Sequence, residues 1–262
     1  MYWDILLHYH QPTLKLLNEL PVPSEEAQTH LNRLERERNI ILPASLREWY
    51  TLARATIILN EFSHDDRAIE VEQLGEADNY WQGDSGEQRR LLEQGYLPIL
   101  VENQGLCIWA IYLDNSDDPP VVLSFEKDIT CVIWEPHATT FSEFIYTRIW
   151  DHLCLNSNYL LHSWGPVVSA ADLEFLHEKL HPEPETLTHP GLFNYRFSDG
   201  TIRVLIWENE DHAEWLLSAN AEEDMRWLLK TLWNRQWLVR TIDPWTPDAK
   251  KALKKLRREL SR

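Results

Sequence analysis

Apolar positions in the first third of the chain recur at helical spacing. Ala27, Leu31 and Leu34 are four and three residues apart, which places them on one face of a helix that ends near Asn39. Pro43 then occupies a first-turn position of a second helix, where a missing N–H is tolerated. The pattern therefore predicts two consecutive amphipathic helices.

From residue 96 onward, apolar residues instead form short runs separated by turn residues. Tyr96–Glu102 and Leu106–Leu113 flank an Asn-Gln-Gly turn and predict two paired strands, and Val121–Phe125 and Cys131–Trp134 predict two more. Helical spacing then returns in a stripe of five residues, Phe141, Phe144, Ile145, Ile149 and Leu153. We expect this helix to cover one face of an antiparallel sheet, in an α+β domain that spans residues 1–155.

The remaining residues, 156–262, predict a smaller α+β unit. Its expected elements are a helix over Ala170–Leu180, a hairpin of Phe193–Phe197 and Thr201–Trp207, a strand over Glu214–Ser218, and a helix over Glu222–Trp233. Asp199-Gly200 is expected to supply the positive φ angles of the tight hairpin turn.

Charge is abundant and unevenly distributed. The chain has 42 acidic and 25 basic residues, a formal net charge of -17, and its 44% hydrophobic content with 13 Trp is ample for packed cores. The last residues, Lys250 to Arg262, nevertheless form an amphipathic basic helix, with Ala252, Leu253, Leu256 and Leu260 at helical spacing. We expect this helix to pack on the acidic body, the alternatives being contact with an anionic membrane or with nucleic acid. A chain this acidic favours a basic protein partner over nucleic acid, although the charge could also serve solubility alone.

Neither a membrane span nor a secretion signal is expected. The sequence has no apolar run of about 18 residues, and its first residues lack a basic region and a small-residue cleavage site. Cys107, Cys131 and Cys154 are spaced unlike a zinc site, and we expect them to be buried free thiols. The expected location is the cytoplasm.

The strongest catalytic pattern is a literal H-E-x-x-H string, His177-Glu178-Lys179-Leu180-His181. On one helix, this spacing turns both imidazoles toward a zinc ion and the glutamate toward a bound water. However, Pro182 follows the second histidine directly and disfavours helical geometry there. A zinc-dependent hydrolase therefore remains only an alternative, and no catalytic residue, metal or cofactor is expected.

Five segments in a fixed order resemble the SMI1/KNR4 family, part of the SUKH superfamily of bacterial toxin-immunity and regulatory proteins. They are LERERNIILPASLREWY (residues 34–50), YLPILVENQGLCIWAIYLD (96–114), PPVVLSF (119–125), CVIWEP (131–136) and TTFSEFIYTRIW (139–150). The resemblance covers the N-terminal three-fifths of the chain; it departs from the family pattern at residues 51–62, which lack glycine, and in the C-terminal unit.

The resemblance implies a non-catalytic protein-binding module. In this family many bacterial members bind and neutralise a cognate toxin, often a nuclease, and others are regulatory or scaffold proteins. Carboxylates suit such binding because they can occupy an electropositive nuclease site in place of phosphates.

The expected partner-binding residues are acidic positions and two aromatic residues that lie between acids in the sequence. The segment from Glu61 to Glu87 has nine acids and one base, which could also mark only a solvated connection. Acidic positions in this segment and in the turn before Val121 are expected to face a basic toxin domain: Glu70, Glu72, Glu76, Asp78, Asp84, Asp114, Asp117 and Asp118. Tyr80 and Trp81 are the expected aromatic anchors.

Overall fold

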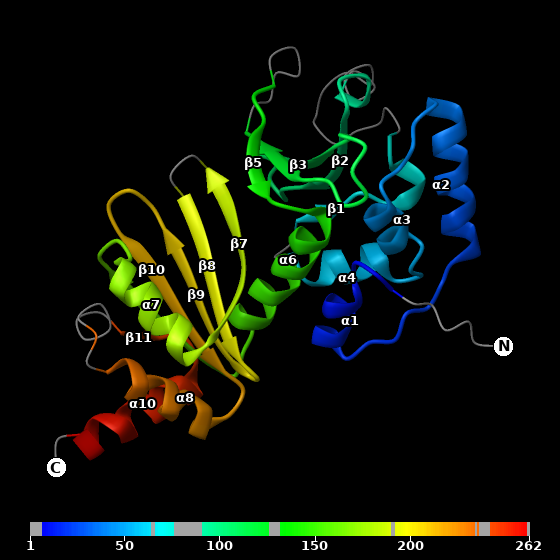
Figure 1. Cartoon of the computed structure of the whole chain (residues 1–262). Helices are drawn as coiled ribbons and strands as arrows, with labels where there is room; N and C mark the ends of the chain where they lie inside the picture. The colour runs from blue at the N-terminus through cyan, green and yellow to red at the C-terminus, as the bar shows by residue number, and fades with distance from the viewer. Residues whose placement is uncertain are drawn as a thin grey trace. The chain divides into compact units, whose positions relative to one another are not determined.

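A computed structural model describes residues 7–63, 66–75, 91–125, 132–189, 192–233, 235 and 242–260. The chain forms two compact units, Met1–Ile149 (unit 1) and Trp150–Arg262 (unit 2). The division falls inside one helix, whereas the sequence predicts a boundary after residue 155, at the end of that helix. Both units combine helices with an antiparallel sheet, which confirms the α+β class (Figure 1).

Unit 1 has a five-stranded sheet in the order β1-β2-β3-β4-β5. The strands are β1 (Arg67–Ala68), β2 (Tyr96–Val101), β3 (Ile108–Tyr112), β4 (Val121–Ser124) and β5 (Glu135–Ala138). The helices are α1 (Gln11–Leu17), α2 (Glu25–Arg38), α3 (Ala44–Tyr50), α4 (Ala55–Glu61), the short 3-10 helix η1 (Val71–Gln73), and α6 (Phe141–Leu155), whose last residues belong to unit 2.

The first long helix, α2, has the limits that its sequence predicts. The Ser24 hydroxyl accepts a hydrogen bond from the Ala27 amide at 3.1 Å and caps the N-terminus. Asn39, with φ of 51°, ends the helix in the left-handed conformation. Leu31 and Leu34 are buried as expected.

The α6 stripe is confirmed for Phe141, Phe144, Ile145 and Ile149, which are buried, while Leu153 is half-buried. The strand expected over Cys131–Trp134 is wrong in the described part of that segment. Residues 132–134 are not in a strand, and β5 starts at Glu135. The half-buried Trp134 ring stacks on Tyr96 instead, with centroids 4.6 Å apart, so part of its apolar surface is covered without strand pairing.

Unit 2 has a six-stranded sheet in the order β11-β6-β10-β9-β8-β7. Its strands are β6 (Tyr159–Gly165), β7 (His181–His189), β8 (Leu192–Asp199), β9 (Ile202–Glu208), β10 (Ala213–Ala219) and β11 (Asp243–Pro244); its helices are α7 (Ala170–Lys179), α8 (Glu222–Leu232) and α10 (Pro247–Leu260).

The hairpin turn differs in one detail from its prediction. Asp199 is still paired with Ile202, so the loop is Gly200-Thr201, and only Gly200 has a positive φ, 60°. Glycine at the first position of a two-residue loop is typical of a type II′ turn.

One core joins α7, α8 and α10 to the sheet of unit 2. Leu176 of α7, Leu228 of α8 and Leu256 of α10 share this core with Trp215 of β10. The basic C-terminal helix therefore packs its apolar stripe on the body of its own unit, as expected. Charged residues flank that contact: Lys255, for example, forms an ion pair with Glu222 at 2.8 Å.

Candidate protein-binding surface

The strand order brings two separate acidic segments of unit 1 to the same end of its sheet. β1 is antiparallel to β2, with Ala68 opposite Leu100, so the chain leaves β1 toward the end of the sheet where Tyr96 is paired with Tyr112. η1 follows there with Glu72 in it and Glu70 directly before it, and the β3–β4 connection turns at the same end. We call this the acidic end, and its predicted residues are Glu70, Glu72, Asp114, Asp117 and Asp118. The other predicted binding residues, Glu76, Asp78, Tyr80, Trp81 and Asp84, lie outside the described residues.

Two carboxylates that the sequence analysis did not select lie beside Asp117 and Asp118. The pKa of Tyr9 is raised by burial and by the negative charges of Asp117, Asp118 and Glu48. The pKa of Glu143 is raised by burial and by Asp118. The Ser45 amide of α3 also donates to the Asp117 carbonyl oxygen at 2.9 Å. The N-terminal segment, α3 and α6 therefore lie near the β3–β4 turn, a long-range arrangement that no local pattern in the sequence predicts.

Several of these acids have structural roles. Glu48 accepts hydrogen bonds from the backbone amides of His8, Tyr9 and His10 at 2.7, 2.8 and 2.7 Å, and so holds the segment before α1. Asp118 accepts hydrogen bonds from the Ser142 amide at 3.0 Å and from its hydroxyl at 2.5 Å, at the first turn of α6.

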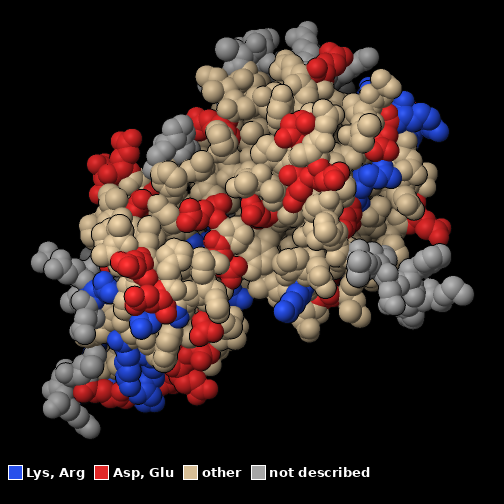
Figure 2. Space-filling model, viewed as in Figure 1, with Lys and Arg blue, Asp and Glu red and all other residues tan. Residues whose placement is uncertain are grey.

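Other acids are available for contact with a partner. Asp117 and Glu70 are exposed, and neither carboxylate forms an ion pair or hydrogen bond with a described residue. Asp114 is exposed too, although the Ser116 amide donates to it at 2.9 Å, and this bond lowers the pKa of Asp114. Figure 2 shows acidic side chains spread over the visible face of this unit.

His10 lies under this cluster but is not suited to proton transfer at the surface. Its side chain is buried, its Nε2 atom lies 2.9 Å from the Ser45 carbonyl oxygen, and its ring contacts Trp49 and Phe141. Burial lowers the pKa of His10, so the ring stays neutral and acts as part of the core.

The structure separates the two histidines of the H-E-x-x-H string. α7 ends at Lys179 and Leu180 is extended, so His177 is on the helix while His181 begins β7. The His177 ring packs edge-on against Phe197 at 5.2 Å. The helical geometry that makes this string a zinc site is therefore not formed.

A different set of side chains could hold a metal ion. Glu26 and His30, one turn apart on α2, have ligand atoms within 4.8 Å of each other and of Glu72 in η1. His30 Nε2 lies 3.9 Å from Glu72 Oε1. Among the described residues, this is the one group of three or more possible ligands at such distances.

Both described cysteines are free and buried, as expected, and Cys131 lies outside the described residues. Burial raises the pKa of Cys107 and of Cys154 to about 12. Neither thiol is therefore suited to act as a nucleophile at neutral pH.

No protein-family model, no curated protein and no solved structure matches this chain. The resemblance to the SMI1/KNR4 family therefore stays a prediction that rests on the order of its five segments. None of the described helices combines the length and apolar character that a membrane crossing requires.

Proposed function

We propose that this protein is a non-catalytic binding protein whose acidic end holds a basic protein partner. In keeping with the SMI1/KNR4 resemblance, the proposed partner is a basic toxin domain of the nuclease type, which the protein would neutralise in the cytoplasm. A regulatory or scaffold protein would use the same surface for a different basic partner, and the identity of the partner distinguishes these two functions.

The observation that carries this proposal is the convergence of acids from separate segments at one end of the sheet. η1 and the β3–β4 turn contribute predicted acids, and α3 and α6 add Glu48 and Glu143. Grouped carboxylates attract a basic partner over a long range and raise its association rate.

The structural acids also support the proposal, because they fix the position of the exposed ones. Asp118 is bound to the start of α6, so the neighbouring Asp117 is held in place before a partner arrives. Pre-organisation of this kind reduces the entropy lost on binding. Carboxylates held at fixed positions can match Lys and Arg side chains that otherwise bind phosphates.

The test begins with capture of partners by the tagged protein from its own cells at low and moderate salt. The retained protein is then identified, purified and titrated against the Glu70→Lys/Asp117→Lys variant. We expect its affinity to fall by roughly tenfold or more, mostly through a slower association rate.

A matched control makes the same change in charge on unit 2. Glu210 and Asp211 are exposed, so Glu210→Lys/Asp211→Lys changes the net charge equally without touching the acidic end. We expect this control to lose only a small part of its affinity for the partner. Equal losses in the two variants would mean that net charge, and not the acidic end, attracts the partner.

The same preparation tests the zinc-hydrolase alternative. Near-stoichiometric zinc that disappears in His177→Ala, without a retained basic protein, would overturn the binding proposal. Zinc retained in His177→Ala but lost in His30→Ala would place the metal at α2 and η1 instead.

A further inference from the structure

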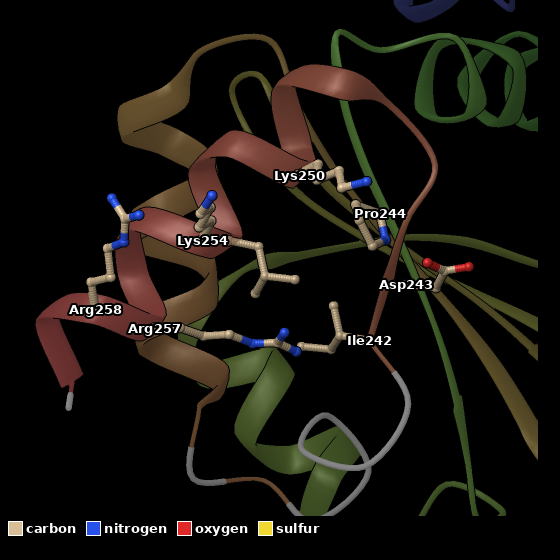
Figure 3. Close-up of a pocket in the computed structure, with 8 residues that line it drawn as sticks. Ile242, Asp243, Pro244, Lys250, Lys254, Arg257 and Arg258 are labelled. Atoms are coloured by element: carbon tan, nitrogen blue, oxygen red, sulfur yellow. The ribbon is translucent and has the colours of Figure 1, made fainter.

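The side of α10 that faces β11 borders a cavity of about 780 Å³ in unit 2 (Figure 3). Four cationic side chains of α10 line it, Lys250, Lys254, Arg257 and Arg258, and among the described lining residues Asp243 is the one acid. The cations are spaced by four, three and one residues, so they follow one side of the helix. In Figure 3, the Arg257 side chain extends across the cavity toward Ile242, and Lys250 extends toward Pro244.

The basic residues of α10 divide into two groups. On one side of the helix, Lys251 forms an ion pair with Asp248 at 2.8 Å, and Lys255 with Glu222 at 2.8 Å. On the cavity side, Lys250, Lys254 and Arg258 form no ion pair with a described residue. Figure 2 shows the Lys and Arg side chains gathered over α10 with acidic side chains beside them. The cavity therefore concentrates positive charge in a protein whose formal net charge is -17.

The remaining described residues of the cavity wall are apolar. Leu253 is buried, and Ile242 and Pro244 are half-buried. A wall with both cationic and apolar parts suits a ligand that has an anionic group attached to an apolar body. The volume lies within the range of about 300–1,000 Å³ that is typical of small-molecule sites.

A membrane surface fits this site less well than a soluble ligand. An amphipathic helix binds a bilayer by inserting its apolar face. The apolar face of α10 is already used, because Ala249, Ala252, Leu253 and Leu256 are buried in the core of unit 2.

We propose that this cavity binds a soluble phosphate ester with an apolar organic group. The phosphate would lie between the lysine and arginine side chains, whose N–H groups donate charge-assisted hydrogen bonds to its oxygens. The organic group would pack on Leu253, Ile242 and Pro244. Asp243 would accept a hydrogen bond from a hydroxyl or amine of the ligand, and would disfavour a purely polyanionic ligand.

The test titrates the full-length protein with phenyl phosphate, inorganic phosphate and phenol, using calorimetry and tryptophan fluorescence. Trp245 directly follows the lining residue Pro244 and is 49% exposed, so it is placed to report on binding. We expect phenyl phosphate to bind roughly tenfold more tightly than inorganic phosphate, and phenol not to bind measurably.

The helix offers a matched pair of double variants. Lys250→Ala/Lys254→Ala removes two cations from the cavity, and Lys251→Ala/Lys255→Ala removes two cations at the same spacing from the paired side. All four side chains are exposed, so both variants are expected to fold, which circular dichroism checks. We expect at least roughly tenfold weaker binding of phenyl phosphate for the first variant and a change of less than about twofold for the second.

Three results would overturn the proposal. One is that phenyl phosphate does not bind; another is that both variants lose affinity equally, which would indicate only unspecific attraction. The third is tight binding to vesicles of phosphatidylcholine with phosphatidic acid but no binding to soluble phenyl phosphate, which would assign the cations to a lipid headgroup.

Discussion

The acidic end of unit 1 and the basic helix of unit 2 differ in sign but divide their charges in the same way. In unit 1, Asp118 is bound to the start of α6, whereas Asp117 beside it is exposed and forms no ion pair with a described residue. In unit 2, Lys255 is paired with Glu222, whereas its neighbour Lys254 borders the cavity. In both units, adjacent residues of the same charge have different roles. The net charge of a segment is therefore a weaker predictor of binding than the direction in which each of its charged side chains points.

The largest loss of stability is expected at Arg196, a charged residue whose role is entirely structural. The Arg196 guanidinium is 2% exposed and donates to both carboxylate oxygens of Asp151, at 2.6 and 2.7 Å. It also donates to the Pro184 carbonyl oxygen and the Thr186 hydroxyl at 3.0 Å each. Arg196→Met would leave Asp151 without its partner, and we expect the free energy of unfolding to fall by about 3–5 kcal/mol in a urea titration.

The control for this change is Arg226→Met. Arg226 forms a comparable pair with Glu259 at 2.7 Å, but both side chains are considerably more exposed than Arg196. Water replaces the lost contact there, so we expect a much smaller loss of stability. Losses of similar size at the two sites would show that burial does not separate structural charges from the others.

A smaller effect is expected from the two neighbouring aspartates of the acidic end. Asp118→Ala removes an acceptor from the first turn of α6, and we expect the free energy of unfolding to fall by about 1–2 kcal/mol. Asp117→Ala should change it by less than about 0.5 kcal/mol, because its carboxylate forms no hydrogen bond with a described residue. When partner affinity is measured in place of stability, we expect Asp117→Ala to have the larger effect and Asp118→Ala the smaller one. If Asp117→Ala also destabilised the protein, its carboxylate would be structural too.

The same cluster predicts a dependence of stability on pH. Burial, and then the charge of Asp118, raise the pKa of Glu143 above that of an ordinary glutamate. Between the ordinary pKa, which applies in the unfolded chain, and the raised pKa of the folded state, the folded protein binds more protons than the unfolded chain. The contribution of Glu143 to stability therefore decreases as pH rises through that window. Glu143→Gln should flatten this part of the stability curve.

Carboxyl NMR titration measures the same effect on the single residue. We expect the pKa of Glu143 to decrease in Asp118→Asn, because the second cause of its increase is removed. An unchanged pKa in that variant would mean that burial alone is responsible.

Local patterns predicted the parts of this fold that depend on local forces. The stripe and the caps of α2 follow from side chains a few residues apart, and the α6 stripe was predicted for the same reason. The edge strand β7 was not predicted, because Pro182 and Pro184 indicate a break. A strand at the edge of a sheet needs hydrogen bonds on one side only, so it tolerates these prolines.

In the candidate sites, too, local sequence patterns do not predict contacts that only the tertiary fold creates. Asp114, Asp117 and Asp118 are close in sequence and were predicted together, but Glu48 and Glu143 join them only through the tertiary fold. The H-E-x-x-H string is local, yet the end of α7 at Lys179 separates its two histidines. The cavity beside α10 also needs β11, which no pattern in the sequence indicated.

The smallest expected effects have opposite signs on adjacent lysines. Lys255→Ala removes the ion pair with Glu222 and should lower the free energy of unfolding by about a few tenths of a kcal/mol. Lys254→Ala removes a charge that lies one turn from both Lys250 and Arg258 and forms no ion pair with a described residue, so it should raise stability slightly. Thermal unfolding at low salt should show the two shifts, and both should shrink at high salt because mobile ions screen exposed charges. A loss of stability in Lys254→Ala would mean that this lysine supports the fold, and the cavity would then lose one of the cations expected to hold its ligand.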